Sequence, residues 1–185
     1  MLPVDDVVNE INEDSGYTKY EIDDGTAKVL TLIQKDTLPD DSVSFVLNAV
    51  RYYVSRLDIK YDVTARIVDY IKSGDEKTDI MKNIAGNLQT ACYDPENREI
   101  VVISGGRNLV DVVRSVAHEL IHVDQHDNGR LETFDIPLKI SKGDAGWEAE
   151  YEAYGLSGIL TREFRAIMND GEEPDFVYQV RINAI

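Results

Sequence analysis

The sequence has little of what several classes of protein require. It has one cysteine, Cys92, so it can form no intrachain disulfide and cannot hold zinc with a cluster of thiolates. Its 19 basic residues stand against 35 acidic ones, which gives a formal net charge of −16. Contact with nucleic-acid phosphates or with an anionic membrane needs a basic surface, so neither is an expected partner.

Targeting and membrane signals are also missing from the sequence. Residues 1–16 are acidic and lack the basic and apolar regions of a secretory signal. No run approaches the roughly 18 apolar residues of a membrane span. We therefore expect a cytoplasmic protein, and a virion-associated protein would lack the same signals. Because 43% of the 185 residues are hydrophobic, the chain can bury the core of one domain.

The hydrophobic pattern predicts a mainly helical N-terminal part, residues 1–87. Residues 17–33 differ from the rest of this part, because their pattern predicts two strands around an Asp-Asp-Gly turn. Asp41 or Ser42 is the expected N-cap of the second helix in this part. Helical spacing occurs at residues 4–11, 42–57, 61–74 and 75–87.

The rest of the chain mixes strands and helices. Residues 88–168 are predicted to form the core around a metal site: a hairpin at 88–104, a long helix at 108–126 and another at 147–168. Residues 169–185 would add a C-terminal strand or arm. Strands and helices do not alternate as βαβ units, so we predict a single α+β domain over residues 1–185.

All three histidines lie within nine residues, in the stretch SVAHELIHVDQH. His118 and His122 are four residues apart, so on a helix both can reach one Zn²⁺, while Glu119 can act on a water beside the metal. At about 100° per residue the apolar side chains form a separate stripe, which leaves the histidines on a polar face of their own. That stripe comprises Leu109, Val112, Val113, Val116, Leu120 and Val123.

His126 lies four residues beyond His122 and extends the same face. Three histidines over two turns of one straight helix rarely converge on a single tetrahedral ion. We favour a simpler role, in which a cation meets the negative end of the helix dipole, over a role as third ligand.

A catalytic zinc site needs three protein ligands and one open position, so a carboxylate is expected to complete it. The helix at 147–168 offers Glu148, Glu150 and Glu152. Glu150 lies at the margin of the apolar stripe, beside Ala153 and Ser157. Glu152 lies at the other margin and Glu148 points furthest out. Glu150 is favoured, and the other two remain alternatives.

These motifs resemble those of the gluzincin metallopeptidases, the thermolysin-like branch of the zincins, in which HExxH is followed on a second helix by a ligand glutamate. Glu150-Tyr151-Glu152-Ala153 fits the E-x-E-A form of that second motif. The resemblance covers residues 98–165. It implies a zincin-like fold with a small sheet packed on the HExxH helix, Zn²⁺ as cofactor, and His118, His122 and Glu150 as ligands.

The resemblance also implies an activity, the hydrolysis of peptide bonds with Glu119 as general base. An aspartate that several relatives carry four residues after the ligand is replaced here by Tyr154, for which we expect a packing role. The strand within residues 98–104 would be a sheet edge that pairs with an extended peptide substrate, or else a plain core strand.

The alternative is a non-catalytic component of a larger assembly on the same scaffold. Its C-terminal segment, residues 176–185, would pair with a protein partner.

Overall fold

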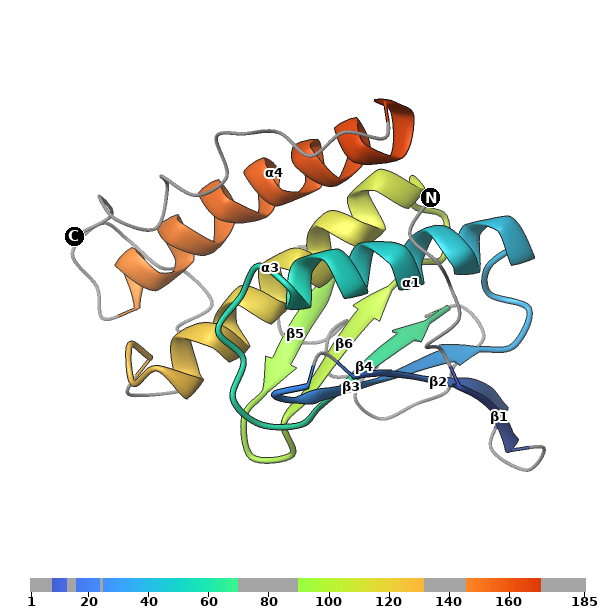
Figure 1. Ribbon diagram of the computed structural model, residues 1–185, viewed down its shortest axis with the longest axis horizontal. Helices are drawn as coiled ribbons and strands as arrows, with labels where there is room; N and C mark the ends of the chain where they lie inside the picture. Colours follow the sequence, from blue (N-terminus) through green and yellow to red (C-terminus); the bar gives the residue numbers. More distant parts are fainter. Residues whose placement is uncertain (1–7, 13–15, 24, 70–89, 132–145, 171–185) are drawn as a thin grey trace.

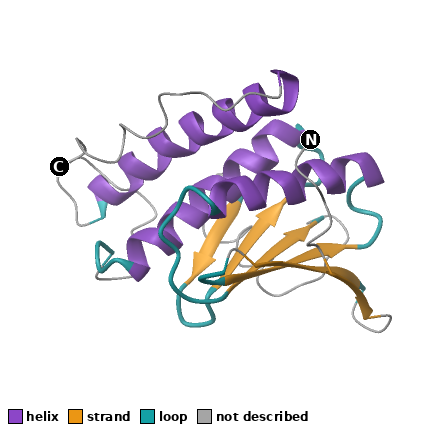
Figure 2. Cartoon of the chain, viewed as in Figure 1, coloured by secondary structure: helices purple, strands orange, loops and turns teal. Residues whose placement is uncertain are grey.

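The computed structural model describes residues 8–12, 16–23, 25–69, 90–131 and 146–170, which form a six-stranded sheet and three helices (Figures 1 and 2). This confirms the α+β class. The strands are β1 (Val8–Asn12), β2 (Tyr17–Asp23), β3 (Lys28–Gln34), β4 (Val63–Val68), β5 (Ala91–Asp94) and β6 (Glu99–Ile103). The helices are α1 (Asp40–Val54), α3 (Leu109–Asp127) and α4 (Trp147–Asp170).

The sheet joins the N-terminal and C-terminal parts of the chain. Its strand order is β1-β2-β3-β4-β6-β5. The central pairs β3–β4 and β4–β6 are parallel, and the outer pairs are antiparallel. The prediction that residues 1–87 are mainly helical is wrong for their described part, which contributes four strands and one helix. The hairpins predicted at 17–33 and 88–104 are confirmed as β2–β3 and β5–β6.

The helix predicted at 61–74 is wrong where the structure describes it, because residues 63–68 form β4. Val63, Ala65 and Ile67 are at most 3% exposed and point to one face, which is the two-residue period of a strand. Valine, threonine and isoleucine are also stiff at χ1, which favours a strand over a helix. The pairing of β4 with β3 and β6 therefore decides its structure.

Two further N-terminal predictions are corrected. Part of the helix expected at 4–11 is strand β1, whose backbone pairs with β2 in the register Val8↔Glu21. Helix α1 begins at Asp40 after Pro39, so Asp41 and Ser42 lie in its first turn and neither is the N-cap. Residues 169 and 170 of the strand or arm predicted at 169–185 belong instead to α4, whose helical pattern continues through them. The rest of that segment and the helix predicted at 75–87 lie outside the described residues.

The described helices form two layers above the sheet. α1 and α3 lie against one face of the sheet, and α4 lies on α3 on the side away from the sheet (Figure 1). Aromatic rings join α1 to α4, with the centroids of Phe45 and Phe164 5.0 Å apart. Tyr53, which is fully buried, also reaches across with its hydroxyl 3.3 Å from Thr161 Oγ1. α3 lies between the sheet, through β5 and β6, and α4.

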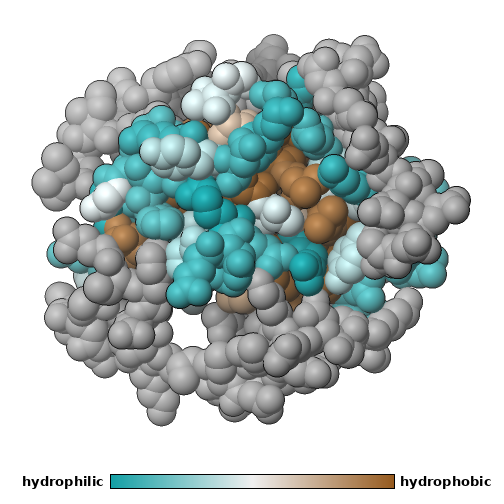
Figure 3. Space-filling view, turned by 90° about the horizontal axis from the view of Figure 1, so that it is seen from below, coloured by the Kyte–Doolittle hydropathy of each residue, from teal (hydrophilic) through white to brown (hydrophobic). Residues whose placement is uncertain are grey.

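The strand before α3 is an interior strand rather than a sheet edge, because β6 lies between β4 and β5. All five of its residues are buried. Ile100 and Val102 join the core under the helices, whereas Val101 and Ile103 pack with Val68 on the opposite face. Of the two predictions for this strand, the plain core strand is confirmed and the sheet edge for substrate pairing is wrong. Seen from below, the described surface mixes hydrophilic residues with hydrophobic patches (Figure 3).

The start of α3 is fixed by a side-chain cap. Asn108 has an extended backbone, and its Oδ1 accepts a hydrogen bond of 2.9 Å from the amide of Val110. We expect Asn108→Ala to lower the free energy of unfolding by about 1 kcal/mol, measured by urea denaturation, because one amide loses its acceptor. Asn108→Asp keeps the acceptor and should preserve stability. Equal stability of the alanine and aspartate variants would refute the capping role.

Candidate metal centre

His118, Glu119 and His122 project from α3 on the side that α4 covers. The sequence predicts that they lie on a polar face separate from the core. In the structure this face is largely buried under α4. Glu119 and His122 are only 6% and 3% exposed, because α4 packs over them. Ala153 and Ser157, two small residues of α4, are at most 1% exposed and permit this close packing. The polar face of α3 is therefore the buried interface between two helices.

Glu150, from the first turn of α4, meets both histidines in this interface. His118 Nε2 and His122 Nε2 lie 3.1 Å apart. The Glu150 carboxylate oxygens lie 3.4 Å from His118 Nε2 and 3.1 Å from His122 Nε2. One ligand atom from each of the three residues can be chosen so that all lie within 4.8 Å of one another. The three residues together could hold a metal ion.

The three side chains are close enough to be compared with the ligands of a tetrahedral ion. Bonds of 2.0–2.1 Å at tetrahedral angles separate neighbouring ligand atoms by about 3.3 Å. The two imidazole nitrogens, 3.1 Å apart, are near that value, and different oxygens of Glu150 lie 3.4 Å from His118 Nε2 and 3.1 Å from His122 Nε2. Two imidazole nitrogens and one carboxylate also make up a donor set used in catalytic zinc sites.

The electrostatics of the cluster favour positive charge at its centre. Burial opposes ionisation of Glu150, but hydrogen bonds from His118 and His122 outweigh it and lower the pKa of Glu150 to about 2. Burial likewise opposes a charged His122, yet Glu150 and Glu119 raise the pKa of that imidazole. The surrounding carboxylates thus favour positive charge at this place, which a bound cation would supply instead of a proton on His122.

Glu119 lies beside the cluster without belonging to it. Burial raises the pKa of its carboxyl group, His122 and His118 lower it, and the net shift is upward. A carboxylate with a raised pKa is a stronger base. A buried carboxylate next to a candidate metal centre is therefore well suited to accept a proton.

The other two glutamates of the first turns of α4 are not in the cluster. Glu148 is exposed to solvent. Glu152 turns toward Arg130, whose Nη1 donates hydrogen bonds of 2.7 and 2.8 Å to its two carboxylate oxygens. Of the three candidates, the structure brings only Glu150 together with the histidines.

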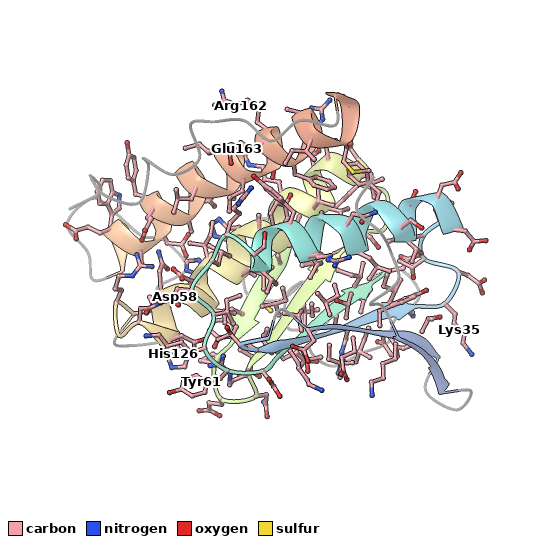
Figure 4. All side chains as sticks on the ribbon, in the orientation of Figure 1. Lys35, Asp58, Tyr61, His126, Arg162 and Glu163 are labelled. Atoms are coloured by element: carbon pink, nitrogen blue, oxygen red, sulfur yellow. The ribbon has the colours of Figure 1, made fainter. Side chains whose placement is uncertain are left out.

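His126 is not part of the His118–His122–Glu150 cluster. It lies in the last turn of α3, where its Nδ1 is 2.9 Å from the hydroxyl of Tyr93. It lies at the same end of the molecule as Asp58 and Tyr61 (Figure 4). Tyr154 packs its ring against His118, with centroids 4.7 Å apart.

Gln125 is the residue of this site that sequence reasoning misses. Its Oε1 is 2.8 Å from Nδ1 of His122, and its side chain is completely buried. One signal in the sequence could have found it, since a residue three positions after His122 lies beside it on a helix. Glutamine is uncharged, however, and nothing in the sequence alone shows that α4 covers it.

Comparisons with known proteins identify no relative of this chain. A scan against protein-family models and searches of curated proteins and of solved structures found no match for this chain. Within the described residues, no helix has both the length and the apolarity needed to cross a membrane.

Proposed function

We propose that this chain is a zinc-dependent metallopeptidase on a zincin-like scaffold of the gluzincin type. His118, His122 and Glu150 would hold Zn²⁺, and Glu119 would serve as general base. The observation that carries the proposal is the meeting of two imidazoles and one carboxylate, with ligand atoms within 4.8 Å of one another, beside a second, buried carboxylate. The HExxH pattern and the sheet packed under its helix support the same interpretation.

The chemistry divides between the ion and the chain. Bound zinc would lower the pKa of a water molecule to about 7 and polarise a peptide carbonyl. Glu119 would take the proton from the attacking water on its carboxylate and pass it to the leaving amine. Burial keeps competing solvent away from this carboxylate, so its basicity is preserved.

A substrate can approach the cluster from the side of His118 and Glu150. Their side chains are 15% and 19% exposed, against 3% for His122. The donor set has three members, so one position of a four-coordinate ion would remain for water or substrate. An extended peptide or protein chain is the proposed substrate.

Peptide cleavage tests the proposal. The purified protein, reconstituted with one equivalent of zinc, should cleave members of a random peptide library, with the products identified by mass spectrometry. A chelator should stop the reaction and added zinc should restore it. A protein that binds zinc at this site but cleaves no member of the library would argue for a non-catalytic metal protein instead.

Zinc should also stabilise the fold, because its proposed ligands come from two helices. At a free concentration 100 times the dissociation constant, a ligand that binds only the folded state adds about 2.7 kcal/mol. For a chain of this size that corresponds to about 5–10 °C in melting temperature. Calorimetry with and without zinc measures the shift. Equal melting temperatures under the two conditions would contradict a site between α3 and α4.

A further inference from the structure

A chain of hydrogen bonds leads from the metal centre through Gln125 to α4. His122 Nδ1 lies 2.8 Å from Gln125 Oε1. The amide nitrogen of Gln125 donates to the carbonyl of Ala149 at 2.9 Å and to Glu152 Oε2 at 2.8 Å. Both acceptors belong to α4, so this fully buried glutamine connects the helix of the histidines to the helix of Glu150.

These contacts determine where the hydrogen on the His122 ring lies. Both N–H groups of the Gln125 amide are used by Ala149 and Glu152, so its oxygen faces His122 and can only accept. His122 Nδ1 must then carry the hydrogen of this bond. In the neutral ring the lone pair is consequently on Nε2, the atom that faces His118 and Glu150.

We propose that Gln125 is a positioning residue of the metal centre, one that holds the His122 ring with hydrogen on Nδ1 and directs its Nε2 lone pair at the ion. The inference rests on the proposed function for the identity of that ion as zinc. Metal-ligating histidines are commonly oriented by a hydrogen bond that the second ring nitrogen donates to a carboxylate, a carbonyl or water. Here a side-chain amide supplies that acceptor.

Gln125 is itself held by charged groups. Glu152 is fixed by two hydrogen bonds from Arg130 Nη1, in addition to the one from Gln125. The other guanidinium nitrogen, Nη2, binds Asp124, whose Oδ1 accepts a hydrogen bond of 2.7 Å from the amide of Asp58. Because Ala149 and Glu152 both face Gln125 with an oxygen, reversal of the Gln125 amide would place its oxygen against theirs. The orientation of the amide is thus set from outside the site.

Metal affinity provides the first test. We expect Gln125→Met, which keeps the length of the side chain but has no acceptor for Nδ1–H, to weaken zinc binding by about 10- to 100-fold. Competition with a fluorescent chelator measures the dissociation constant. Gln34→Met is the matched control: Gln34 Oε1 accepts from the amide of Asp69, on the sheet, and its loss should leave zinc affinity unchanged. A folded Gln125→Met protein with parental affinity would overturn the inference.

A second test uses the parent protein and does not depend on the folding of a variant. In ¹⁵N NMR spectra of the zinc-loaded protein, the His122 ring should show a hydrogen on Nδ1 that exchanges slowly with water. Exchange as fast as that of a free imidazole, or zinc bound through Nδ1, would refute the role of Gln125 even if peptides are cleaved. Slow exchange and weakened binding in Gln125→Met would support it even if no peptide is cleaved, so the two proposals can fail separately.

Discussion

Glu119→Gln should bind zinc with the affinity of the parent and lose nearly all peptide hydrolysis. The amide cannot accept the proton of the attacking water, and general-base assistance contributes about 10²- to 10⁴-fold to rates of this kind. Glu119 lies outside the His118–His122–Glu150 cluster, so the proposed donor set is intact in the variant. The rate constant kcat should therefore fall by about that factor, measured on a peptide identified from the library.

The control for this variant is Glu148→Gln, the same chemical change at an exposed position of α4. It should retain the parental rate and zinc content. If Glu119→Gln cleaved the peptide as fast as Glu148→Gln, Glu119 would not be the base. If Glu119→Gln instead lost its zinc, the carboxylate would be a ligand, and the assignment of roles would be wrong.

Glu150→Ala should have the largest effect on metal binding among variants of the three glutamates of α4. It removes one of three proposed ligands. Substitutions of residues that only orient the ligands usually lower metal affinity by up to about 100-fold, so the loss of zinc affinity here should be larger than that. The variant should also lose the stabilisation by zinc, because α4 would no longer be joined to α3 through the ion. Chelator competition and calorimetry measure the two effects.

Glu148→Ala and Glu152→Ala are the matched controls for this second prediction. Glu148→Ala should bind zinc like the parent. Glu152→Ala should show an intermediate loss, since Glu152 orients Gln125 without reaching the cluster. A Glu152→Ala protein that binds zinc more weakly than Glu150→Ala would make Glu152 the third ligand and contradict the assignment.

The helix with the histidines and the partner glutamate could be predicted from the sequence because both depend on local spacing. His118 and His122 share a face through the helical period alone, and Glu150 lies at the margin of an apolar stripe on its own helix. Neither feature requires knowledge of the rest of the fold. The structure adds the fact that the two helices pack with these faces together.

What the sequence did not reveal depends on contacts between distant segments. The sequence pattern predicts a helix where β4 lies. Val63, Ala65 and Ile67 form a strand because they pair with β3 and β6, which are distant in the sequence. Gln125 was missed because its acceptor role requires Ala149 and Glu152 from another helix. The sequence left open whether residues 98–104 form a sheet edge or a core strand, because the choice depends on the pairing of β6 with β4, a distant segment.

A crystal structure of the zinc-loaded protein, with anomalous diffraction recorded at the zinc absorption edge, tests the central claim most directly. We expect one anomalous peak between α3 and α4, about 2.0–2.1 Å from His118 Nε2, from His122 Nε2 and from one oxygen of Glu150. Glu119 should lie near the fourth position without a bond to the metal. The absence of a peak there, or a peak bound to other side chains, would contradict the account.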